Sequence, residues 1–552
     1  MLPHLVWILA NSATLRYSPE FGTTALLKFV CSGTPDFAYD LAARQAIVYR
    51  GGLWVLCPAN DPALPIPLWT EPVTRRDAIT TARLGRDRQL ERSVAGRAHL
   101  IGIGGAGMRA IADLLRQRGW QVSGSDLAPL PPRLGGQRGH AAEHVPHDAD
   151  LVVYSDAVPA ENCERLRAEA LGLKPISYPQ MLARLTAGLP TLAVAGTHGK
   201  STTTALAAEI LIEAGLDPTV VCGAAPSGRS SGGRAGEGGL VLVEACEYRA
   251  NFLHLTPDVS VILPIEPDHF DAFPTFDSLV DTFTRFSGQT ASSGLLLVAG
   301  DCPTALRATA RSARRRETFG LGPEATWRAV DLHSQSGCYA FRLEYRGQTL
   351  THVQLQVPGH HQVENALAAA ALALSAGADV AAARRGLEGF RGLQRRLEPV
   401  GSFAGVAWID DYAHHPTEIR AGLATLREVA PDARLWCVFQ PHQASRTAAL
   451  VDELAESLHN ADKVFVTEIF RAREGPPAPG EVKAADLAAK ARWLGADVAA
   501  VHRPTDVGRA IASAVEHGEL TAGDVVVTMG AGTIGSLGHE LIERFRERRA
   551  AG

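Results

Sequence analysis

A glycine-rich run near residue 200 carries the clearest chemical signal in this chain of 552 residues. An apolar stretch at 192–194 precedes it and a helical apolar pattern at 205–211 follows, which predicts a strand, a phosphate-binding loop and a helix. Glycines let backbone N–H groups approach an anion, the helix N-terminus adds positive partial charge, lysine reaches terminal phosphates, and a serine hydroxyl can ligate Mg²⁺. We therefore expect ATP with Mg²⁺ here, held by Gly196, Thr197, His198, Gly199, Lys200, Ser201 and Thr202.

The spacing of this loop differs from the common pattern G-x-x-x-x-G-K-[ST], which would place a glycine where the chain has Val194. Generic nucleoside triphosphatases are therefore less favoured. A glycine turn that binds no nucleotide is less favoured still, because a turn requires neither Lys200 nor Ser201.

Two acidic clusters follow apolar runs downstream of the loop. Glu244 follows the run at 240–243, and His269 belongs to the sequence E-P-D-H-F-D after the run at 259–263. The carboxyl ends of parallel strands share one crevice, so this carboxylate and imidazole can complete a Mg²⁺ site with Ser201. Each residue alone could equally fill a hydrogen-bonded structural role, but their order after a phosphate loop favours function.

A second glycine-rich loop lies upstream, with glycines at 102, 104, 105 and 107. A β-like run starts at His99, a helix is predicted at 110–118, and a further strand ends at Asp126. The pattern resembles a dinucleotide-binding fingerprint, whose glycines admit a diphosphate close to the backbone at a helix N-terminus. A nicotinamide nucleotide is one candidate ligand on this signal alone.

A third cluster, D-D-Y-A-H-H-P-T-E at 410–418, leads into a predicted helix whose first turn suits Pro416. The neighbours His414 and His415 make a poor zinc pair, because adjacent side chains point apart and no H-x-x-x-H accompanies them.

Ordered motifs between residues 97 and 546 resemble those of the Mur ligases, which build the peptide of bacterial cell-wall precursors. They read I-G-I-G-G-A-G-M at 101–108, S-D-A-V-P-A-E-N at 155–162, G-T-H-G-K-S-T-T at 196–203, G-H-H-Q-V-E-N-A at 359–366, F-R-G-L-Q-R-R-L at 390–397, the 410–418 cluster, and F-Q-P-H-Q-A-S-R-T at 439–447. The resemblance implies an α/β chain with three domains: a Rossmann-like UDP-sugar-binding domain at 97–189, a central P-loop ATPase domain at 190–394 and a C-terminal Rossmann-like domain at 395–552. A small extension of unknown role, 1–94, precedes them.

The resemblance also implies a reaction: ATP phosphorylates the lactyl carboxylate of UDP-N-acetylmuramate, and L-alanine then attacks the acyl phosphate, in peptidoglycan precursor synthesis. The implied catalytic residues are Lys200, His269, Arg396, Asp411 and His414, with Asn365 and Arg396 also contacting the nucleotide. Ser201, Glu244 and His269 would hold the metal. Gly104, Gly105, Gly107, Asp126, Ser155, His442 and Arg446 would bind substrate. Asn365 could instead cap the alanine-rich helix that it opens.

The chain departs from the family pattern at several positions. It has Cys246, Tyr248 and Arg249 where Asp, Ser and Asp are usual, and Gln362 and Gln443 replace Asn and Arg. A related ligase that attaches recycled tripeptides also carries tyrosine at the serine position, so a murein peptide ligase stays an alternative, although its opening motif G-I-C-G-T-x-M does not fit. Folylpolyglutamate synthase lacks the UDP domain. A non-catalytic nucleotide sensor or a dehydrogenase leaves the ATPase motifs unexplained.

The bulk composition excludes other classes. The chain is 46% hydrophobic and 20% charged with a formal net charge of −5, so neither disorder nor broad attraction to nucleic acid is indicated. Eight scattered cysteines without C-x-x-C predict reduced thiols, and no apolar run reaches the length of a membrane span. We expect a cytoplasmic monomer or homodimer. Within 1–94, β-like runs at 46–50 and 53–56 predict a hairpin, and the charged stretch 75–92 predicts a connecting helix.

Overall fold

The computed structural model describes residues 96–499 and 503–551, together with the backbone of five strands between residues 14 and 58. The chain divides into two compact units, Met1–Arg75 and Arg76–Gly552. In the first unit five strands pair in chain order: β1 (Thr14–Leu15), β2 (Leu26–Val30), β3 (Phe37–Asp40), β4 (Gln45–Arg50) and β5 (Leu53–Pro58). The antiparallel pairing of β4 with β5 confirms the expected hairpin. The charged stretch 75–92 lies outside the described residues.

The second unit begins with a parallel five-stranded sheet in the order β10-β9-β6-β7-β8. Its strands are β6 (Arg97–Ile101), β7 (Gln121–Asp126), β8 (Gly136–Arg138), β9 (Leu151–Tyr154) and β10 (Ile176–Ser177), and its helices are α2 (Ala106–Gln117), α3 (Cys163–Ala170) and α4 (Tyr178–Thr186). The strand, glycine turn and helix predicted around residues 99–118 are confirmed as β6 and α2, with the helix starting four residues earlier than expected.

The middle of the chain forms a ten-stranded sheet in the order β13-β12-β14-β11-β15-β16-β17-β18-β19-β20. Its strands are β11 (Thr191–Ala195), β12 (Thr219–Val221), β13 (Gly233–Arg234), β14 (Val241–Glu244), β15 (Val259–Ile262), β16 (Leu295–Ala299), β17 (Arg315–Gly320), β18 (Trp327–Gln335), β19 (Cys338–Tyr345) and β20 (Gln348–Pro358). Its helices are α5 (Lys200–Glu213), α6 (Phe276–Gln289), α7 (Pro303–Thr309), α8 (His361–Ser375) and α9 (Val380–Gly389). Neighbours from β12 to β18 are parallel, whereas β18, β19 and β20 form an antiparallel extension that the motifs did not indicate.

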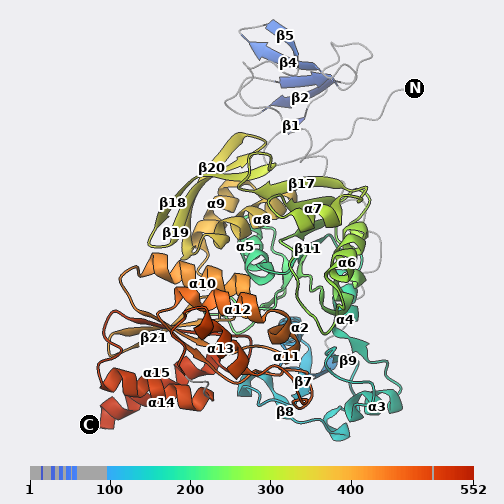
Figure 1. Cartoon of the computed structure of the whole chain (residues 1–552). Coiled ribbons are helices and arrows are strands. Elements are labelled where there is room, and N and C mark those ends of the chain that lie inside the picture. The colour runs from blue at the N-terminus through green and yellow to red at the C-terminus, as the bar shows by residue number, and fades with distance from the viewer. Residues whose placement is uncertain are drawn as a thin grey trace. The chain divides into compact units, whose positions relative to one another are not determined.

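Packing of helix on helix explains why α5 lacks a polar face. Helices α8 and α9 pack against it (Figure 1), and ten of its residues, from Ser201 to Leu211, are buried. The alanines of α8 are small enough to let the two helices approach closely, and all of them are inaccessible to solvent. The helix that carries the phosphate loop is thereby fixed on a rigid base.

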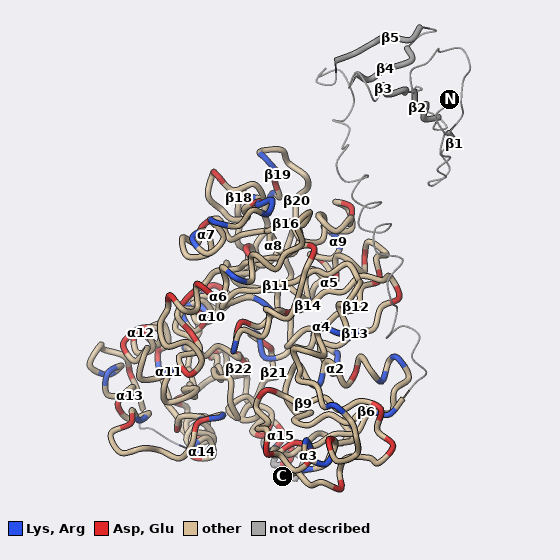
Figure 2. The backbone as a smooth tube through the Cα atoms, turned by 90° about the vertical axis from the view of Figure 1, so that its right-hand side faces the viewer, with Lys and Arg blue, Asp and Glu red and all other residues tan. Residues whose placement is uncertain are grey.

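The C-terminal part forms a third sheet in the order β21-β22-β25-β23-β24, parallel except for the edge strand β21. Its strands are β21 (Glu398–Phe403), β22 (Val406–Asp411), β23 (Leu435–Phe439), β24 (Lys463–Val466) and β25 (Val525–Met529), and its helices are α10 (Pro416–Val429), α11 (Ala444–Ala449), α12 (Val451–Ser457), α13 (Ala484–Trp493), α14 (Pro504–Glu516) and α15 (Gly535–Ala551). Three α/β sheets in one unit confirm the expected fold class. Lys and Arg are interspersed with Asp and Glu over the second unit in the view of Figure 2. None of the helices described is both long and apolar enough to cross a membrane.

Candidate active site

The phosphate loop joins β11, a central strand of the middle sheet, to α5. Gly196 and Gly199 have φ angles of 144° and 79°, which L side chains rarely adopt. A Cβ atom on Gly199 would lie 2.3 Å from Oδ1 of Asn365. The same oxygen accepts a 3.3 Å hydrogen bond from the hydroxyl of Thr203. Helix α8 begins at His361 with His360 as its N-cap, so Asn365 is not a cap; it contacts the phosphate loop instead.

Lys200 is enclosed by acceptors. Its Nζ donates to the carbonyl oxygens of Gly196 at 2.6 Å and Thr197 at 3.0 Å, and to Oε1 of Glu247 at 2.9 Å. Burial lowers the pKa of Lys200, but the charge of Glu247 outweighs burial and raises it above its ordinary value, so the ammonium stays charged. Glu247 is fully buried and also accepts a 3.2 Å bond from Nε2 of His269.

Ser201 and Glu244, two members of the expected metal set, meet directly. Oε2 of Glu244 accepts from the Ser201 hydroxyl at 2.9 Å, from the Gly223 amide at 2.6 Å and from the Cys222 thiol at 3.5 Å. The third expected ligand, His269, contacts Glu247 and not Glu244. The other oxygen of Glu247, Oε2, is buried without a hydrogen-bond partner among the described residues. Hydroxyl and carboxylate oxygens are what Mg²⁺ prefers, so the joined pair of Ser201 and Glu244 fits that ion. The Glu247 oxygen is a further ligand of the same chemical type.

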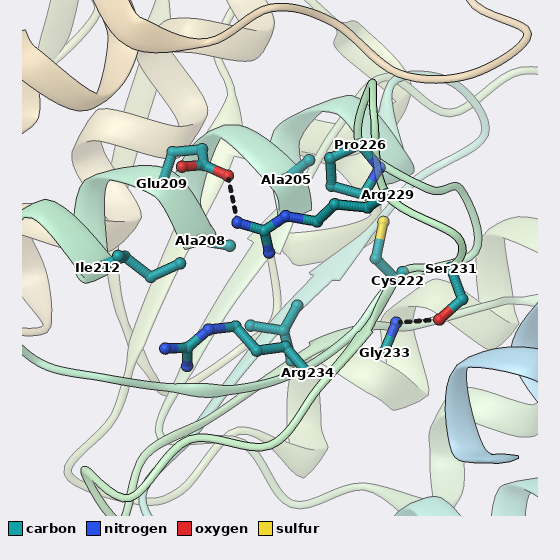
Figure 3. A pocket seen from close by; sticks show the side chains of 12 residues that line it. Ala205, Ala208, Glu209, Ile212, Cys222, Pro226, Arg229, Ser231, Gly233 and Arg234 are labelled. Atoms are coloured by element: carbon teal, nitrogen blue, oxygen red, sulfur yellow. Dashed lines mark hydrogen bonds and ion pairs between the residues drawn. The ribbon is translucent and has the colours of Figure 1, made fainter. Parts of the chain in front are cut away.

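A pocket lies near the pair of Ser201 and Glu244, between α5 and the strands β12 and β13 (Figure 3). Ala208 and Ile212 of α5 line one wall, and an ion pair between Arg229 and Glu209, 3.8 Å apart, crosses it. Cys222 connects the pocket to the site, because its thiol also reaches the Ser201 carbonyl at 3.5 Å.

His198 of the phosphate loop links the middle sheet to α10. Its Nδ1 lies 3.2 Å from Oε1 of Glu418, and its Nε2 lies 3.4 Å from Oε2 of Glu266. Burial lowers the pKa of His198, yet the hydrogen bonds to Glu266 and Glu418 outweigh burial and raise it to about 9. Arg396 approaches the same Glu418 oxygen at 3.6 Å. Glu418 therefore binds two cations and brings Arg396 close to His198 of the phosphate loop.

Arg395, the neighbouring candidate for binding phosphate, forms hydrogen bonds within the C-terminal sheet. It donates from Nε to Asp410 at 2.9 Å and from its guanidinium to the Gly530 carbonyl at 2.7 Å. These bonds hold it within the C-terminal sheet, which favours Arg396 for the nucleotide.

Among the described residues, one group of three metal-type ligands comes within 4.8 Å: His198, Glu266 and His415. The ring nitrogens of His415 already take part in hydrogen bonds, one to the Pro267 carbonyl at 3.2 Å and one from the Thr417 amide at 3.3 Å. His198 has a carboxylate at each nitrogen. Ion pairs and helix capping thus account for this group without a metal.

His414 is held uncharged near neutral pH, whereas Asp411 titrates there. Asp411 accepts from the amides of Leu397 at 3.2 Å and Ala413 at 2.7 Å, and burial raises its pKa to about 7 although Arg396 opposes the shift. Burial lowers the pKa of His414 to about 4, despite the nearby Glu418. Nδ1 of His414 donates to the Tyr412 carbonyl at 3.0 Å, which leaves Nε2 as the acceptor nitrogen.

His442 and Arg446, expected at the substrate, lie beside this histidine. The rings of His414 and His442 are 5.5 Å apart, and Arg446 donates to Nδ1 of His442 at 2.7 Å. Arg446 is 3% exposed and also donates twice to Oδ1 of Asp268, at 2.8 and 2.6 Å. A buried ion pair therefore joins the C-terminal part to the E-P-D-H segment of the middle sheet.

The residues expected at the UDP-sugar gather at the carboxyl ends of β6, β7 and β9. Oδ2 of Asp126 accepts from the Gly104 amide at 2.9 Å, and Gly105 is the N-cap of α2. A Cβ on Gly107 would lie 2.6 Å from the ring of Tyr178. Ser155 follows β9, and its side chain lies beside the first glycine of the loop, Gly102. All five expected residues therefore share one end of the first sheet.

Three acidic residues that the sequence reasoning did not assign hold the site together: Glu247, Asp268 and Glu418. Each stands inside a recognised motif, which is the one signal that pointed to it. Their partners lie 47, 178 and 220 residues away, and no spacing rule pairs residues so distant.

Three family models match this chain. The Mur ligase family catalytic domain matches residues 97–189, the Mur ligase middle domain matches 194–373, and the Mur ligase glutamate ligase domain matches 395–532. A UDP-N-acetylmuramate--L-alanine ligase from Streptomyces griseus is 39% identical over 464 residues, which cover 82% of this chain and 98% of that protein.

Two solved structures are also similar. The crystal structure of UDP-N-acetylmuramate-alanine ligase MurC from Thermotoga maritima has a TM-score of 0.68 at 26% identity and covers 82% of this chain and all of that one. A murein peptide ligase from Psychrobacter arcticus has a TM-score of 0.63 at 25% identity and covers 82% of this chain and 99% of its own.

Proposed function

This chain belongs to the Mur ligase family, and from that premise we propose that it joins L-alanine to the lactyl carboxylate of UDP-N-acetylmuramate at the expense of ATP. The observation that carries the reaction is the phosphate loop: Lys200 starts α5, and Glu418 brings Arg396 to the same loop through His198. The reaction belongs to peptidoglycan precursor synthesis. We place it in the cytoplasm, where ATP is available.

The chemistry requires an activated carboxylate, because a carboxylate carbon is electron-rich and oxide is a poor leaving group. Transfer of the γ-phosphoryl group gives an acyl phosphate that an amine can attack. We propose that Lys200 and Arg396 stabilise the negative charge that spreads over the transferring phosphoryl group. Such electrostatic stabilisation of the transition state is the largest contribution to catalysis in phosphoryl-transfer enzymes. Ser201, Glu244 and Glu247 would hold Mg²⁺, which supplies further neutralisation of phosphate charge.

The amine step needs a proton acceptor. We assign it to His414, whose neutral ring has Nε2 without a hydrogen-bond partner among the described residues. Arg396 lies within electrostatic range of Asp411, and we assign both to orienting the nucleotide, together with Asn365, which contacts the helix of the phosphate loop. His269 positions Glu247 through their shared hydrogen bond.

We further propose that the diphosphate of the sugar nucleotide binds the loop of Gly104, Gly105 and Gly107, with Asp126 and Ser155 beside it. A helix N-terminus with close backbone approach suits a diphosphate. His442 and Arg446 would contact the substrate from the C-terminal domain. The domains run from 97 to 189, from 190 to 394 and from 395 to 552.

The first test measures phosphate release from ATP with UDP-N-acetylmuramate and one amine at a time: L-alanine, glycine, L-serine or L-Ala-γ-D-Glu-diaminopimelate. Release that needs both the sugar nucleotide and L-alanine is expected. Release with the tripeptide alone would make the chain a recycling ligase, and no release with any amine would favour a nucleotide sensor.

Lys200→Ala should lower kcat by about 10³-fold, because it removes a charge aimed at the reacting phosphate. The exposed Lys174 gives a matched control, and Lys174→Ala should keep full activity. Circular dichroism checks that both variants fold. A folded Lys200→Ala variant with wild-type turnover would refute the assignment.

A further inference from the structure

Three consecutive or near-consecutive residues at which the chain departs from the family pattern, Cys246, Tyr248 and Arg249, flank Glu247, the acceptor of Lys200. Tyr248 begins a short 3₁₀ segment, Tyr248–His254, and is 7% exposed. Its hydroxyl donates to Asp271 at 3.0 Å, and its ring meets that of His269 edge-on at 5.3 Å.

Two arginines face the ring of Tyr248. The guanidinium carbon of Arg473 lies 4.3 Å from the ring centroid, and that of Arg249 lies 5.5 Å away. Arg249 also donates to the carbonyl of Asp156 at 3.3 Å. Among the described residues, no carboxylate comes within 4.0 Å of the Arg473 guanidinium, whose N–H donors are therefore available.

The backbone around Arg473 is anchored to the start of α11. The carboxylate of Glu474 accepts from the amides of Ala444 at 2.6 Å and Ser445 at 2.9 Å. Three residues before Arg473, Phe470 donates from its amide to the Pro441 carbonyl and accepts from the Gln443 amide, both at 2.8 Å. The segment thus holds Arg473 against the residues that follow β23.

These contacts place the Arg473 charge on the side of the site where His442 lies. Burial, the neighbouring His414 and the cations Arg446 and Arg473 lower the pKa of His442 to about 2, which puts Arg473 within electrostatic range of that ring. His442 in turn lies 5.5 Å from His414. The chain has Gln443 where its family has arginine, and Arg473 returns a guanidinium to this side of the site.

We propose that Arg473 binds the α-carboxylate of the incoming amino acid. The inference rests on the proposed function, since it names the group that selects the amine substrate. A free amino acid carries its carboxylate one carbon from its amine, so the cation that binds it must lie close to the proton acceptor. The planar guanidinium donates two parallel hydrogen bonds to a carboxylate. In a peptide the corresponding carboxyl is an amide, so Arg473 favours single amino acids.

The decisive experiment compares L-alanine with L-alaninamide, which keeps the amine and lacks the carboxylate charge. Arg473→Gln should raise KM for L-alanine at least tenfold and leave KM for ATP and UDP-N-acetylmuramate within twofold. The ratio of kcat/KM for the acid over the amide should fall about tenfold, and Arg473→Lys should restore part of it. Arg249→Gln, which removes the other cation over the same ring, should leave the ratio unchanged.

Each other result overturns the inference. If Arg473→Gln lowers kcat/KM equally for acid and amide, Arg473 only packs its segment against Tyr248. If Arg249→Gln lowers the acid-over-amide ratio as much as Arg473→Gln does, the effect is one of general positive charge. If the wild type is active with L-alanine but Arg473→Gln leaves the ratio of kcat/KM for acid over amide unchanged, this inference alone is wrong. A wild type inactive with L-alanine sinks the proposed function and this inference with it.

Discussion

Lys200 uses its full donor capacity inside the protein, with two loop carbonyls and Glu247 as its three acceptors. A phosphate oxygen that binds Lys200 must replace one of these acceptors. Glu247 keeps the ammonium charged, and its second oxygen has no hydrogen-bond partner in the described part of the chain. At this scale the site is a set of charges that already satisfy one another, and we expect them to exchange partners when substrate binds.

Asp411 predicts a pH dependence of stability. Its folded pKa of about 7 lies above its ordinary value of 3.8, so the folded protein binds this proton more tightly than the unfolded chain. The stability that it contributes is complete below about pH 3.8 and is lost as the pH rises towards 7. Asp411→Asn mimics the protonated side chain, so the wild type should lose stability relative to this variant by up to about 1.4 kcal/mol per pH unit.

Urea unfolding of both proteins at pH 5, 6, 7 and 8 measures this difference. The comparison cancels the other titrating groups, among them His198, whose contribution is present below pH 6.5 and lost as the pH rises through about 9. Parallel stability curves for wild type and Asp411→Asn would show that Asp411 is ionised in the folded protein.

At the scale of elements, the sequence predicted what local pattern determines. The glycines and Lys200 predicted the β11–loop–α5 unit, and Pro416 predicted the first turn of α10, where His415 and Glu418 form a capping box. The antiparallel β18–β20 extension was missed, because its strands carry no chemical motif and pair through register alone. Asn365 was assigned to the nucleotide, but its contact with Gly199 depends on how α8 packs on α5, which no local pattern encodes.

Two glycines at opposite ends of α5 give a matched pair of variants. Both have left-handed φ angles, 79° at Gly199 and 68° at Gly215, but only Gly199 would bring a Cβ into Asn365. Gly199→Ala should shift the loop amides and lower kcat by about 10²-fold, since small misplacements of a catalytic group are costly. Gly215→Ala should cost about 1 to 2 kcal/mol of stability from its left-handed backbone conformation, but its Cβ atom clashes with no neighbouring residue.

Phosphate-release kinetics and thermal unfolding separate the two effects. The expected pattern is a stability loss in both variants and a catalytic loss in Gly199→Ala alone. If Gly215→Ala lost activity equally, the defect would come from strain in α5 and not from the loop.

At the scale of the whole molecule, the three matched family regions all lie within the second unit, from residue 97 onward. A chain that lacks residues 1–94 should therefore fold and keep kcat/KM for L-alanine within about twofold. A chain that lacks residues 1–101 also loses β6, an interior strand of the first sheet, and should not fold. A folded but inactive 95–552 chain would assign the first unit a part in the reaction.

The pairs that join separate sheets lay beyond sequence reasoning. His198 with Glu418 and Arg446 with Asp268 connect residues far apart in the chain, and their partners follow from the docking of the C-terminal sheet. Motifs named the right segments, but which acid meets which base is decided by tertiary packing.

The pair of Arg446 and Asp268 has a consequence for recognition. Asp268 binds the guanidinium of Arg446 as an internal ligand. An external anion must therefore bind Arg446 more strongly than Asp268 does before it gains affinity from this arginine. The apparent affinity of the anion is reduced in proportion to the fraction of molecules in which Asp268 still binds Arg446. A neutral analogue has no charge with which to displace Asp268. With Arg446 at the substrate, as we propose, we therefore expect this internal competition to separate ionised from uncharged groups.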